Sequence, residues 1–297
     1  MKIIGHCRFS WFGISDTGRH IENTDMAKNI LWHPERMAIR FKLFESVLLP
    51  SVAAQSDQDF ELVILISEAM PEIYRQRLMS LVQNIENIRV LRTSKTDIKS
   101  ALRQTMVQSV SGDAKAVHFR IDDDDGLSRF FVERLHKICS SYDLEEGTAI
   151  SFPKGIVCFF HDGVPKHAEY FRPYVGAGLA FVAGKNYLRN PFQVQHLRVV
   201  KRQPSFVDPT FHAFQITQHG VNTTKGYDAL IHDTTEHTRE INRFVKNNPE
   251  LGKGAVVSAG FDDVIGKSFA PLTGPELRQS LQDTSDPAAL AKHYDFI

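Results

Sequence analysis

The amino-acid sequence predicts an α/β fold built on a mostly parallel, twisted sheet that is flanked by helices. Two observations lead to this expectation. Four short apolar runs alternate with three amphipathic stretches over the first 125 residues, and such alternation is typical of consecutive right-handed crossovers. One run, at 61–66, is apolar almost throughout, as expected of a strand covered on both faces. The first half is therefore a candidate for binding a ligand at one edge of the sheet.

The expected elements of the first half follow one another closely along the chain. In order they are a strand over 2–9, a helix over 34–49, a strand over 61–66, a helix from 71, a strand over 88–91, a helix after Asp97, and a strand from 117. The helix over 34–49 is the clearest, because Met37, Phe41, Phe44 and Leu48 recur at helical spacing between two prolines.

The second half has a different pattern. Strands are expected over 148–152, 155–160 and 178–183, followed by a helical stretch over 211–218 and an irregular, histidine-bearing segment over 222–239. One short helix is expected over 275–281, and residues 282–288 have the composition of a loosely held tail. Neither an internal repeat nor a clear linker divides the chain.

Composition and charge restrict the class of protein. The 297 residues are 42% hydrophobic and 24% charged, and 35 basic residues balance 35 acidic ones. This composition is that of a soluble globular protein, and it provides no overall field that would attract nucleic acid. The three cysteines form no C-x-x-C pair, which favours a reducing cytoplasm over a disulfide framework or a cysteine zinc site.

No membrane or export signal is evident in the sequence. A strand-like run begins within two residues of Met1, so we expect no signal peptide. No apolar stretch approaches the roughly 20 residues that span a bilayer. A cytoplasmic protein is therefore expected, and peripheral contact with the inner face of the membrane is left open.

A run of four aspartates, Asp122 to Asp125, is the most unusual feature. It follows the β-prone run Val117 to Ile121 and precedes Gly126, where the backbone can turn sharply. Acidic runs are usually solvated loops. Here, however, a strand precedes the run and a helix start at Ser128 follows it. Because hard divalent cations prefer oxygen ligands, this position favours a metal-binding or phosphate-linked role.

Three common ligand-binding motifs are absent from the sequence. No G-x-G-x-x-G follows the first strand, and neither a G-x-x-x-x-G-K-[ST] loop nor a G-x-S-x-G elbow occurs. Dinucleotide-binding, P-loop and hydrolase interpretations therefore lose their main support.

Two stretches carry a resemblance to a known group. Arg120-Ile121-Asp122-Asp123-Asp124-Asp125 and the run LPSVAAQSDQDFELVILISE over 49–68 are similar to the bacterial rhamnosyltransferase family, whose members look like glycosyltransferases of the GT-A fold. The resemblance covers roughly residues 1 to 240. It implies transfer of a sugar, such as rhamnose, from a nucleotide-diphosphate donor to a hydroxyl of a saccharide or lipid-linked acceptor. It also implies a divalent metal, Mn²⁺ or Mg²⁺, that bridges the diphosphate.

On this resemblance the chain divides by role. Residues 1–270 would form a single GT-A-like catalytic domain, with a nucleotide-binding half over 1–125 and an acceptor half over 126–270. Residues 271–297 would form a C-terminal extension.

The resemblance also implies a set of site residues. Its Asp-x-Asp element lies within the aspartate run, with metal ligands expected at Asp123 and Asp125; the register is open by one residue because side chains alternate at a strand end. His232 and His237 are the candidates for a further metal ligand from a late loop, although their i, i+5 spacing disfavours a joint site on a helix. The expected nucleotide-binding residues are Arg8, Glu68, Asp97, Arg120, Asp122 and Asp123.

A general base is needed if the transfer inverts stereochemistry. Asp208 is the candidate, since it precedes the helical stretch expected over 211–218. For Asp97 and Asp208 alike, the competing interpretation is a helix cap.

Two other functions remain in competition at this stage. A sugar-nucleotide nucleotidyltransferase would use a similar fold and acidic metal ligands, but the first strand lacks the glycine-rich, basic loop that such enzymes carry after it. A non-catalytic metal-binding protein would use the aspartates to hold a structural cation, but no D-x-[DN]-x-[DN]-G loop is present.

Overall fold

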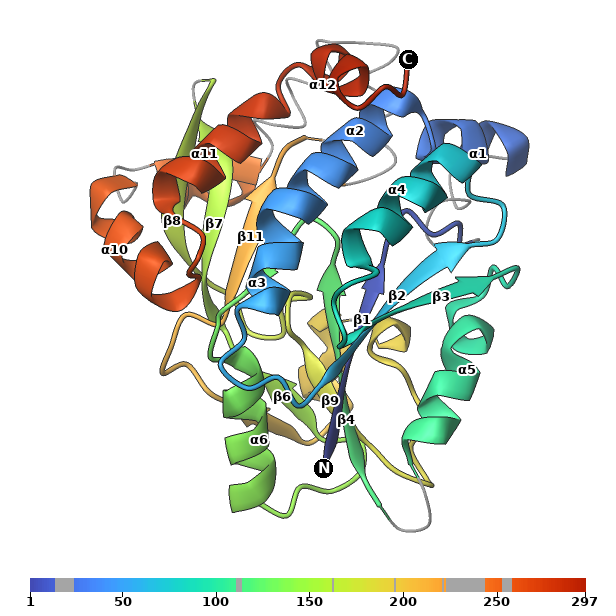
Figure 1. Ribbon diagram of the computed structural model, residues 1–297. Coiled ribbons are helices and arrows are strands. Elements are labelled where there is room, and N and C mark those ends of the chain that lie inside the picture. The colour runs from blue at the N-terminus through green and yellow to red at the C-terminus, as the bar shows by residue number, and fades with distance from the viewer. Residues whose placement is uncertain are drawn as a thin grey trace.

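The structure of the protein is a computed structural model. It describes residues 1–13, 24–110, 114–161, 163–194, 196–220, 222, 244–252 and 258–297. Figure 1 shows a central twisted sheet with helices on both faces and a second, smaller sheet beside it.

The main sheet has seven strands in the order β10-β6-β9-β4-β1-β2-β3. Its parallel core is formed by β1 (Lys2–Arg8), β2 (Glu61–Ser67), β3 (Ile88–Thr93) and β4 (Ala116–Asp122). The other half of the sheet contains β9 (Ala180–Ala183), which is antiparallel to β4, and then β6 (Ala149–Ser151) and β10 (Ser205–Val207). The α/β prediction is confirmed.

A second sheet has four strands in the order β5-β11-β7-β8. They are β5 (Gly126–Leu127), β11 (Phe214–Gln218), β7 (Lys154–His161) and β8 (Val164–Phe171). The helix expected over 211–218 was wrong, because β11 pairs in parallel with β7. The β-branched Ile216 and Thr217 suit a strand, and the pairing partner lies about 60 residues earlier, beyond the reach of a local pattern.

Helices cover both faces of the main sheet or, towards the C-terminus, pack against β8 of the second sheet (Figure 1). They are α1 (Thr24–Leu31), α2 (Pro34–Leu43), the π-helical turn η2 (Phe44–Leu48), α3 (Leu49–Ala53), α4 (Glu72–Val82), α5 (Ile98–Ser109), α6 (Phe131–Ser141), the 3₁₀ turns η3 (Pro191–Gln193) and η4 (His196–Lys201), α9 (Pro249–Gly252), α10 (Ser258–Ser268), α11 (Gly274–Asp283) and α12 (Pro287–His293).

The helix expected over 34–49 is therefore interrupted by a π turn. Pro50 has no N–H to donate to the carbonyl of Ser46, and the backbone N–H of Leu49 instead bonds to the carbonyl of Phe44, five residues back. With this wider turn, α2, η2 and α3 form one continuous helical segment from Pro34 to Ala53.

Strand β2 shows why an unbroken apolar run was expected. Ile64 packs in the core cluster that contains Phe41 of α2, whereas Leu65 packs with Ile98 and Leu102 of α5. Successive residues face opposite sides of the sheet, so both sides of β2 are covered and neither can be polar.

The C-terminal segment packs onto α2 rather than hanging loosely. Figure 1 shows α11 and α12 beside α2. The ring of Phe296 lies 5.6 Å from Phe41 and 4.8 Å from Tyr74, and Lys42 pairs with Asp283 at 2.7 Å. The expectation of a loose tail over 282–288 was wrong. The segment is mostly polar, so its composition suggested a tail, but a few apolar residues beside it, such as Leu290, are buried and anchor it.

Candidate functional site

The aspartate run lies at the carboxyl edge of the parallel strands. Asp122 ends β4 and pairs in register with Arg8 at the end of β1. The chain then turns, with the backbone N–H of Asp125 bonding to the carbonyl of Asp122 at 3.2 Å. A Cβ added at Gly126 would meet Gln215 and Val47 at 3.3 Å, so glycine allows the close packing that follows. Because of this turn, the four carboxylates face different surroundings.

Asp122 is the most exposed of the four and lies between two arginines. Its carboxylate is 3.0 Å from Arg120 and 3.6 Å from Arg8, and 34% of its side chain is exposed. Burial alone would raise the pKa of Asp122, but the charges of Arg120 and Arg8 outweigh burial and lower it. Burial lowers the pKa of Arg8 to about 10. Arg8 therefore stays charged at neutral pH.

An aromatic ring supports both arginines. The guanidinium carbons of Arg8 and Arg120 lie 4.3 Å and 4.7 Å from the ring centre of Phe192 in η3. Asn190 caps η3, and its side-chain amide also donates to the carbonyl of Ile98 at 3.2 Å. Two cations therefore stack on one fixed ring, and one carboxylate balances them. Arg8, Arg120 and Asp122 leave one positive charge, which can neutralise an anion.

Asp123 and Asp124 are buried against Arg40 of α2. The guanidinium of Arg40 contacts Asp123 through Nη2 and donates from Nη1 to Oδ2 of Asp124 at 2.8 Å. Asp124 also lies 2.9 Å from His219 Nε2 and accepts from Asn222 at 3.2 Å. Burial opposes ionisation of Asp124, but Arg40 and His219 hold its pKa well below the ordinary value.

Asp125 has the opposite electrostatic environment. It is 6% exposed, and its Oδ1 accepts from the backbone N–H of Thr217 at 3.3 Å. Burial, with the charges of Asp124 and Asp122, raises the pKa of Asp125 well above the ordinary value. This environment therefore favours the protonated form of Asp125 more than water does.

The expected metal ligands do not form a coordination shell here. Asp123 and Asp125 face separate partners, and within the described residues no three His, Cys, Asp or Glu side chains gather around a point that could hold a cation. Both oxygens of Asp123 lack a hydrogen bond of good geometry, but Arg40 already stands against this carboxylate. His232 and His237 lie outside the described residues.

A cavity of about 380 Å³ opens at the carboxyl ends of β2 and β3. It is lined by Phe12 and Trp32 on one side and by Glu68 and residues 93–96 on another. The N–H of Phe12 bonds to Ser67 Oγ at 2.8 Å, which fixes the chain after β1 beside β2. The cavity offers aromatic faces and a carboxylate, as a nucleobase and ribose require.

Asp97 and Glu68 occupy different environments. Glu68 lines this cavity, and its nucleotide contact stays a prediction. Asp97 caps α5, where its carboxylate accepts from the N–H of Ser100 at 2.8 Å, and these hydrogen bonds lower its pKa. The cap interpretation of Asp97 therefore has direct support from its contacts.

Asp208 lies at the same edge of the sheet, beyond β10. Three strand spacings separate β10 from β4, which is roughly 14 Å at ~4.8 Å per strand. The carboxylate of Asp208 accepts one hydrogen bond of 2.6 Å from Arg134 Nε and another of 2.6 Å from Thr210 Oγ1. Burial would raise the pKa of Asp208, but these hydrogen bonds lower it. No helix follows it; β11 comes next.

Sequence reasoning missed three residues whose side chains contact the carboxylates of the aspartate run. Arg40 is 84 positions before Asp124 in a helix whose basic residues resemble any solvated face, and His219 follows a strand that was expected to be a helix. Asn222 belongs to the same late segment as His219. The only available signal was the apolar neighbourhood of Arg40, between Ile39 and Phe41.

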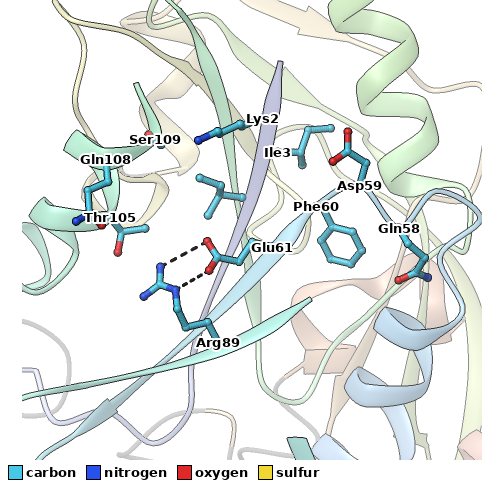
Figure 2. Close-up of a pocket in the computed structure, with 11 residues that line it drawn as sticks. Lys2, Ile3, Gln58, Asp59, Phe60, Glu61, Arg89, Thr105, Gln108 and Ser109 are labelled. Carbon is cyan, nitrogen blue, oxygen red and sulfur yellow. Dashed lines mark hydrogen bonds and ion pairs between the residues drawn. The ribbon is translucent and has the colours of Figure 1, made fainter. Parts of the chain in front are cut away.

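A separate cavity of about 450 Å³ lies at the opposite, amino edge of β1 and β2 (Figure 2). Lys2, Asp59, Glu61 and Arg89 contribute to its lining. Figure 2 shows Arg89 reaching Glu61, with Nε to Oε1 at 2.5 Å. Its two cations are matched by two carboxylates, so this cavity has no charge excess.

Comparisons with known proteins place the chain in a family. Residues 2–229 match the family described as "Putative rhamnosyl transferase". No curated protein matches the chain. Among the described residues, no helix has the length and apolar character needed to cross a bilayer.

Similar solved structures are distant. TarS of S. aureus, residues 1–349 in complex with UDP-GlcNAc, is 10% identical, with a TM-score of 0.40 over 99% of this chain and 92% of that chain. The mannosyltransferase PcManGT from Pyrobaculum calidifontis, in complex with GDP-Man and Mn²⁺, is 12% identical, with a TM-score of 0.41 over 97% and 75%.

The family match covers most of the chain, and it favours sugar transfer over the nucleotidyltransferase and the non-catalytic metal-binding protein. The chain belongs to this rhamnosyl transferase family and is a glycosyltransferase.

Proposed function

We propose that this glycosyltransferase takes its sugar from a nucleoside-diphosphate donor bound across the carboxyl ends of β1 to β4. The observation that carries the proposal is the pairing of Arg8 and Arg120 over one aromatic ring, at the edge where the cavity beside Glu68 opens. Parallel α/β sheets bind ligands at this edge. The base and ribose would enter the cavity, and the diphosphate would reach the arginines.

The arginine pair supplies the chemistry that sugar transfer requires. As the bond between the sugar and the diphosphate breaks, negative charge develops on the leaving oxygen. Guanidinium groups bind phosphate through paired N–H donors, and donors that are already oriented stabilise developing charge without reorganisation. Asp122 contacts both arginines, so it fixes their orientation before the donor arrives.

The identity of the sugar and the acceptor forms a second level of the proposal. Family membership supports a rhamnosyl donor, and the acceptor would be a hydroxyl of a saccharide or a lipid-linked saccharide. We propose Asp208 as the general base, at the same edge of the sheet. Because Arg134 and Thr210 lower its pKa, Asp208 would be a weak base unless the acceptor displaces one of them.

A divalent cation, Mn²⁺ or Mg²⁺, is proposed from the family resemblance alone. Asp123 and Asp125, with His232 or His237, are its proposed ligands. Because Arg40 already contacts Asp123 and Asp124, a cation would compete with a guanidinium. Titrating the metal during nucleotide binding tests this part separately from donor binding.

The experiment that tests the proposed function is a panel of nucleotide-diphosphate sugars that differ in base and sugar and include rhamnosyl donors. Release of nucleoside diphosphate is measured with and without Mn²⁺. We expect release from at least one donor. If no member of the panel is bound or cleaved under either condition, the proposal is wrong.

A further inference from the structure

A positively charged pocket of about 480 Å³ lies beside α5 and η3. Lys99 and Arg103 of α5 line one side, and residues 186–189, which include Tyr187 and Arg189, line the other together with Gln193. The proposed donor site uses none of these residues. The pocket is therefore a separate feature of the molecule.

The lining of this pocket carries excess positive charge. Three of its lining residues are cationic and none is acidic. Across the ranges that the structure describes, neither Lys99, Arg103 nor Arg189 forms an ion pair with a carboxylate. Asp97 is two residues before Lys99 and interacts with its charge, but its carboxylate caps α5. Glu146 accepts from the backbone N–H of Asn186 at 2.8 Å. Like charges one helical turn apart repel, so an anion would relieve the repulsion between Lys99 and Arg103.

A hydroxyl in the same pocket lacks a hydrogen bond. Tyr187 lines the pocket, and its hydroxyl oxygen is buried without a partner among the described residues. Burial also raises the pKa of Tyr187, so the hydroxyl keeps its proton as a donor. Buried polar groups are normally satisfied, and an oxygen of a bound anion would satisfy this one.

The contrast with the cavity in Figure 2 shows that this charge is not a general property of hollows on the molecule. That cavity has a similar volume, but Arg89 there is paired with Glu61 at 2.5 Å. The charge of Lys2 in that cavity is balanced by Asp59, which also lines it. The pocket beside α5, in contrast, has three cationic residues and no acidic one in its lining.

The pocket adjoins the proposed diphosphate site through η3. Gln193 lines the pocket, and its side chain accepts from the backbone N–H of Asn190 at 3.0 Å. The residue before it, Phe192, stacks on Arg8 and Arg120. Two consecutive residues of η3 therefore face the two sites: Phe192 contacts the arginine pair, and Gln193 lines the basic pocket. A molecule held in the pocket would lie next to the reacting centre.

We propose that this pocket binds a phosphate group carried by the acceptor. The assignment rests on the proposed function, since an acceptor exists only if the enzyme transfers sugar. Arg103 and Arg189 can each offer paired N–H donors to phosphate, Lys99 adds a charge, and Tyr187 adds a hydroxyl. Phosphate suits this set because it presents several oxygens to converging donors.

The test compares a monosaccharide phosphate with the same neutral monosaccharide by isothermal titration calorimetry. The variant Lys99→Glu/Arg103→Glu reverses two exposed charges on one helix face, and Lys292→Glu, an exposed cation of α12, is the matched control. We expect the wild type and the control to bind the phosphate and not the neutral sugar. The double variant should bind at least about tenfold more weakly.

Nucleoside diphosphate binding is measured on the same samples. We expect its Kd to stay within about twofold in the double variant, since neither residue belongs to the donor site. If the wild type binds nucleoside diphosphate but the double variant retains its sugar-phosphate affinity, the pocket assignment is wrong and the donor site stands. The pocket assignment is equally wrong if the wild type binds no sugar phosphate. If no nucleoside diphosphate binds, the proposed function itself fails.

The source of the phosphate is decided by a second arm. Vesicles of a neutral phospholipid, with or without a lipid phosphomonoester, are sedimented with each variant. Co-sedimentation that needs the phosphomonoester and disappears in Lys99→Glu/Arg103→Glu assigns the pocket to a lipid-linked acceptor. Binding of the free sugar phosphate alone assigns it to a soluble one. Loss of binding to the same extent in Lys292→Glu would instead show general surface attraction and overturn the assignment.

Discussion

Arg40 donates a hydrogen bond of 2.8 Å to the buried carboxylate of Asp124. The side chain of Arg40 is 6% exposed and that of Asp124 is 5% exposed. The same guanidinium also contacts Asp123. An internal cation therefore neutralises part of the acidic run before any ligand binds. The site holds its carboxylates together because α2 brings this arginine to the edge of the sheet.

Replacing Arg40 should destabilise the fold strongly. Arg40→Met keeps much of the apolar volume but leaves the carboxylates of Asp123 and Asp124 buried without their cation, and breaking a buried pair typically costs about 3–5 kcal/mol. Urea unfolding measures the loss. Lys42→Ala, which breaks the partly exposed pair with Asp283, is the control and should cost no more than about 1 kcal/mol. Equal effects of the two variants would contradict a special role for Arg40.

How much of this could be foreseen depends on sequence distance. The parallel core was predictable because each strand carries its own apolar pattern, as β2 does. The partners of Asp124 were not, since Arg40 and His219 lie 84 and 95 positions away and become neighbours only through the topology of the two sheets. Strand alternation grouped Asp123 with Asp125, and the family resemblance favoured this pair as metal ligands. The chain turns after Asp122, so alternation no longer decides which side chains share a face.

Removing either donor-site arginine should weaken binding of the diphosphate but not of the nucleoside. For Arg8→Ala and for Arg120→Ala we expect the Kd of a nucleoside diphosphate to rise about tenfold or more, because charge-assisted hydrogen bonds are lost. The Kd of the matching nucleoside should stay nearly unchanged. Arg89→Ala, at the opposite edge of the sheet, is the matched control. An equal loss for the nucleoside would indicate general damage to the site.

Phe192 should act as a positioning residue for the two arginines. Phe192→Leu removes both cation–π contacts, each worth about 0.5–2 kcal/mol, so nucleoside diphosphate binding should weaken by about fivefold or more. Phe192→Tyr keeps the ring and should restore the affinity. Calorimetric titration of nucleoside and nucleoside diphosphate separates this role from a loss of folding. A tyrosine variant as weak as the leucine variant would argue against stacking.

The buried pair of His6 and His118 should make stability depend on pH. Their rings are joined Nε2 to Nδ1 at 2.8 Å, and burial lowers the pKa of His118 to about 3 and that of His6 well below its ordinary value. The unfolded chain binds protons near pH 6.5 while the folded chain does not, so stability is full above that pH and falls below it.

Chemical denaturation at pH 7.5 and pH 5 checks this dependence. His118 alone should contribute a loss of about 2 kcal/mol at the lower pH, taking 1.36 kcal/mol per pH unit. His118→Asn should lower stability at pH 7.5 but flatten the dependence between the two pH values. An unchanged slope in the variant would show that other groups set the acid sensitivity.

The central claim is that a nucleotide-diphosphate sugar is bound and cleaved at the edge where Asp122 meets Arg8 and Arg120. The most direct measurement is the rate of nucleoside diphosphate release from the best donor of the panel, in the wild type and in Asp122→Asn. Asparagine keeps the size of the side chain but removes the charge that orients both guanidinium groups. The account predicts a fall of about tenfold or more with an unchanged fold by circular dichroism. A variant that releases nucleoside diphosphate as fast as the wild type would contradict it.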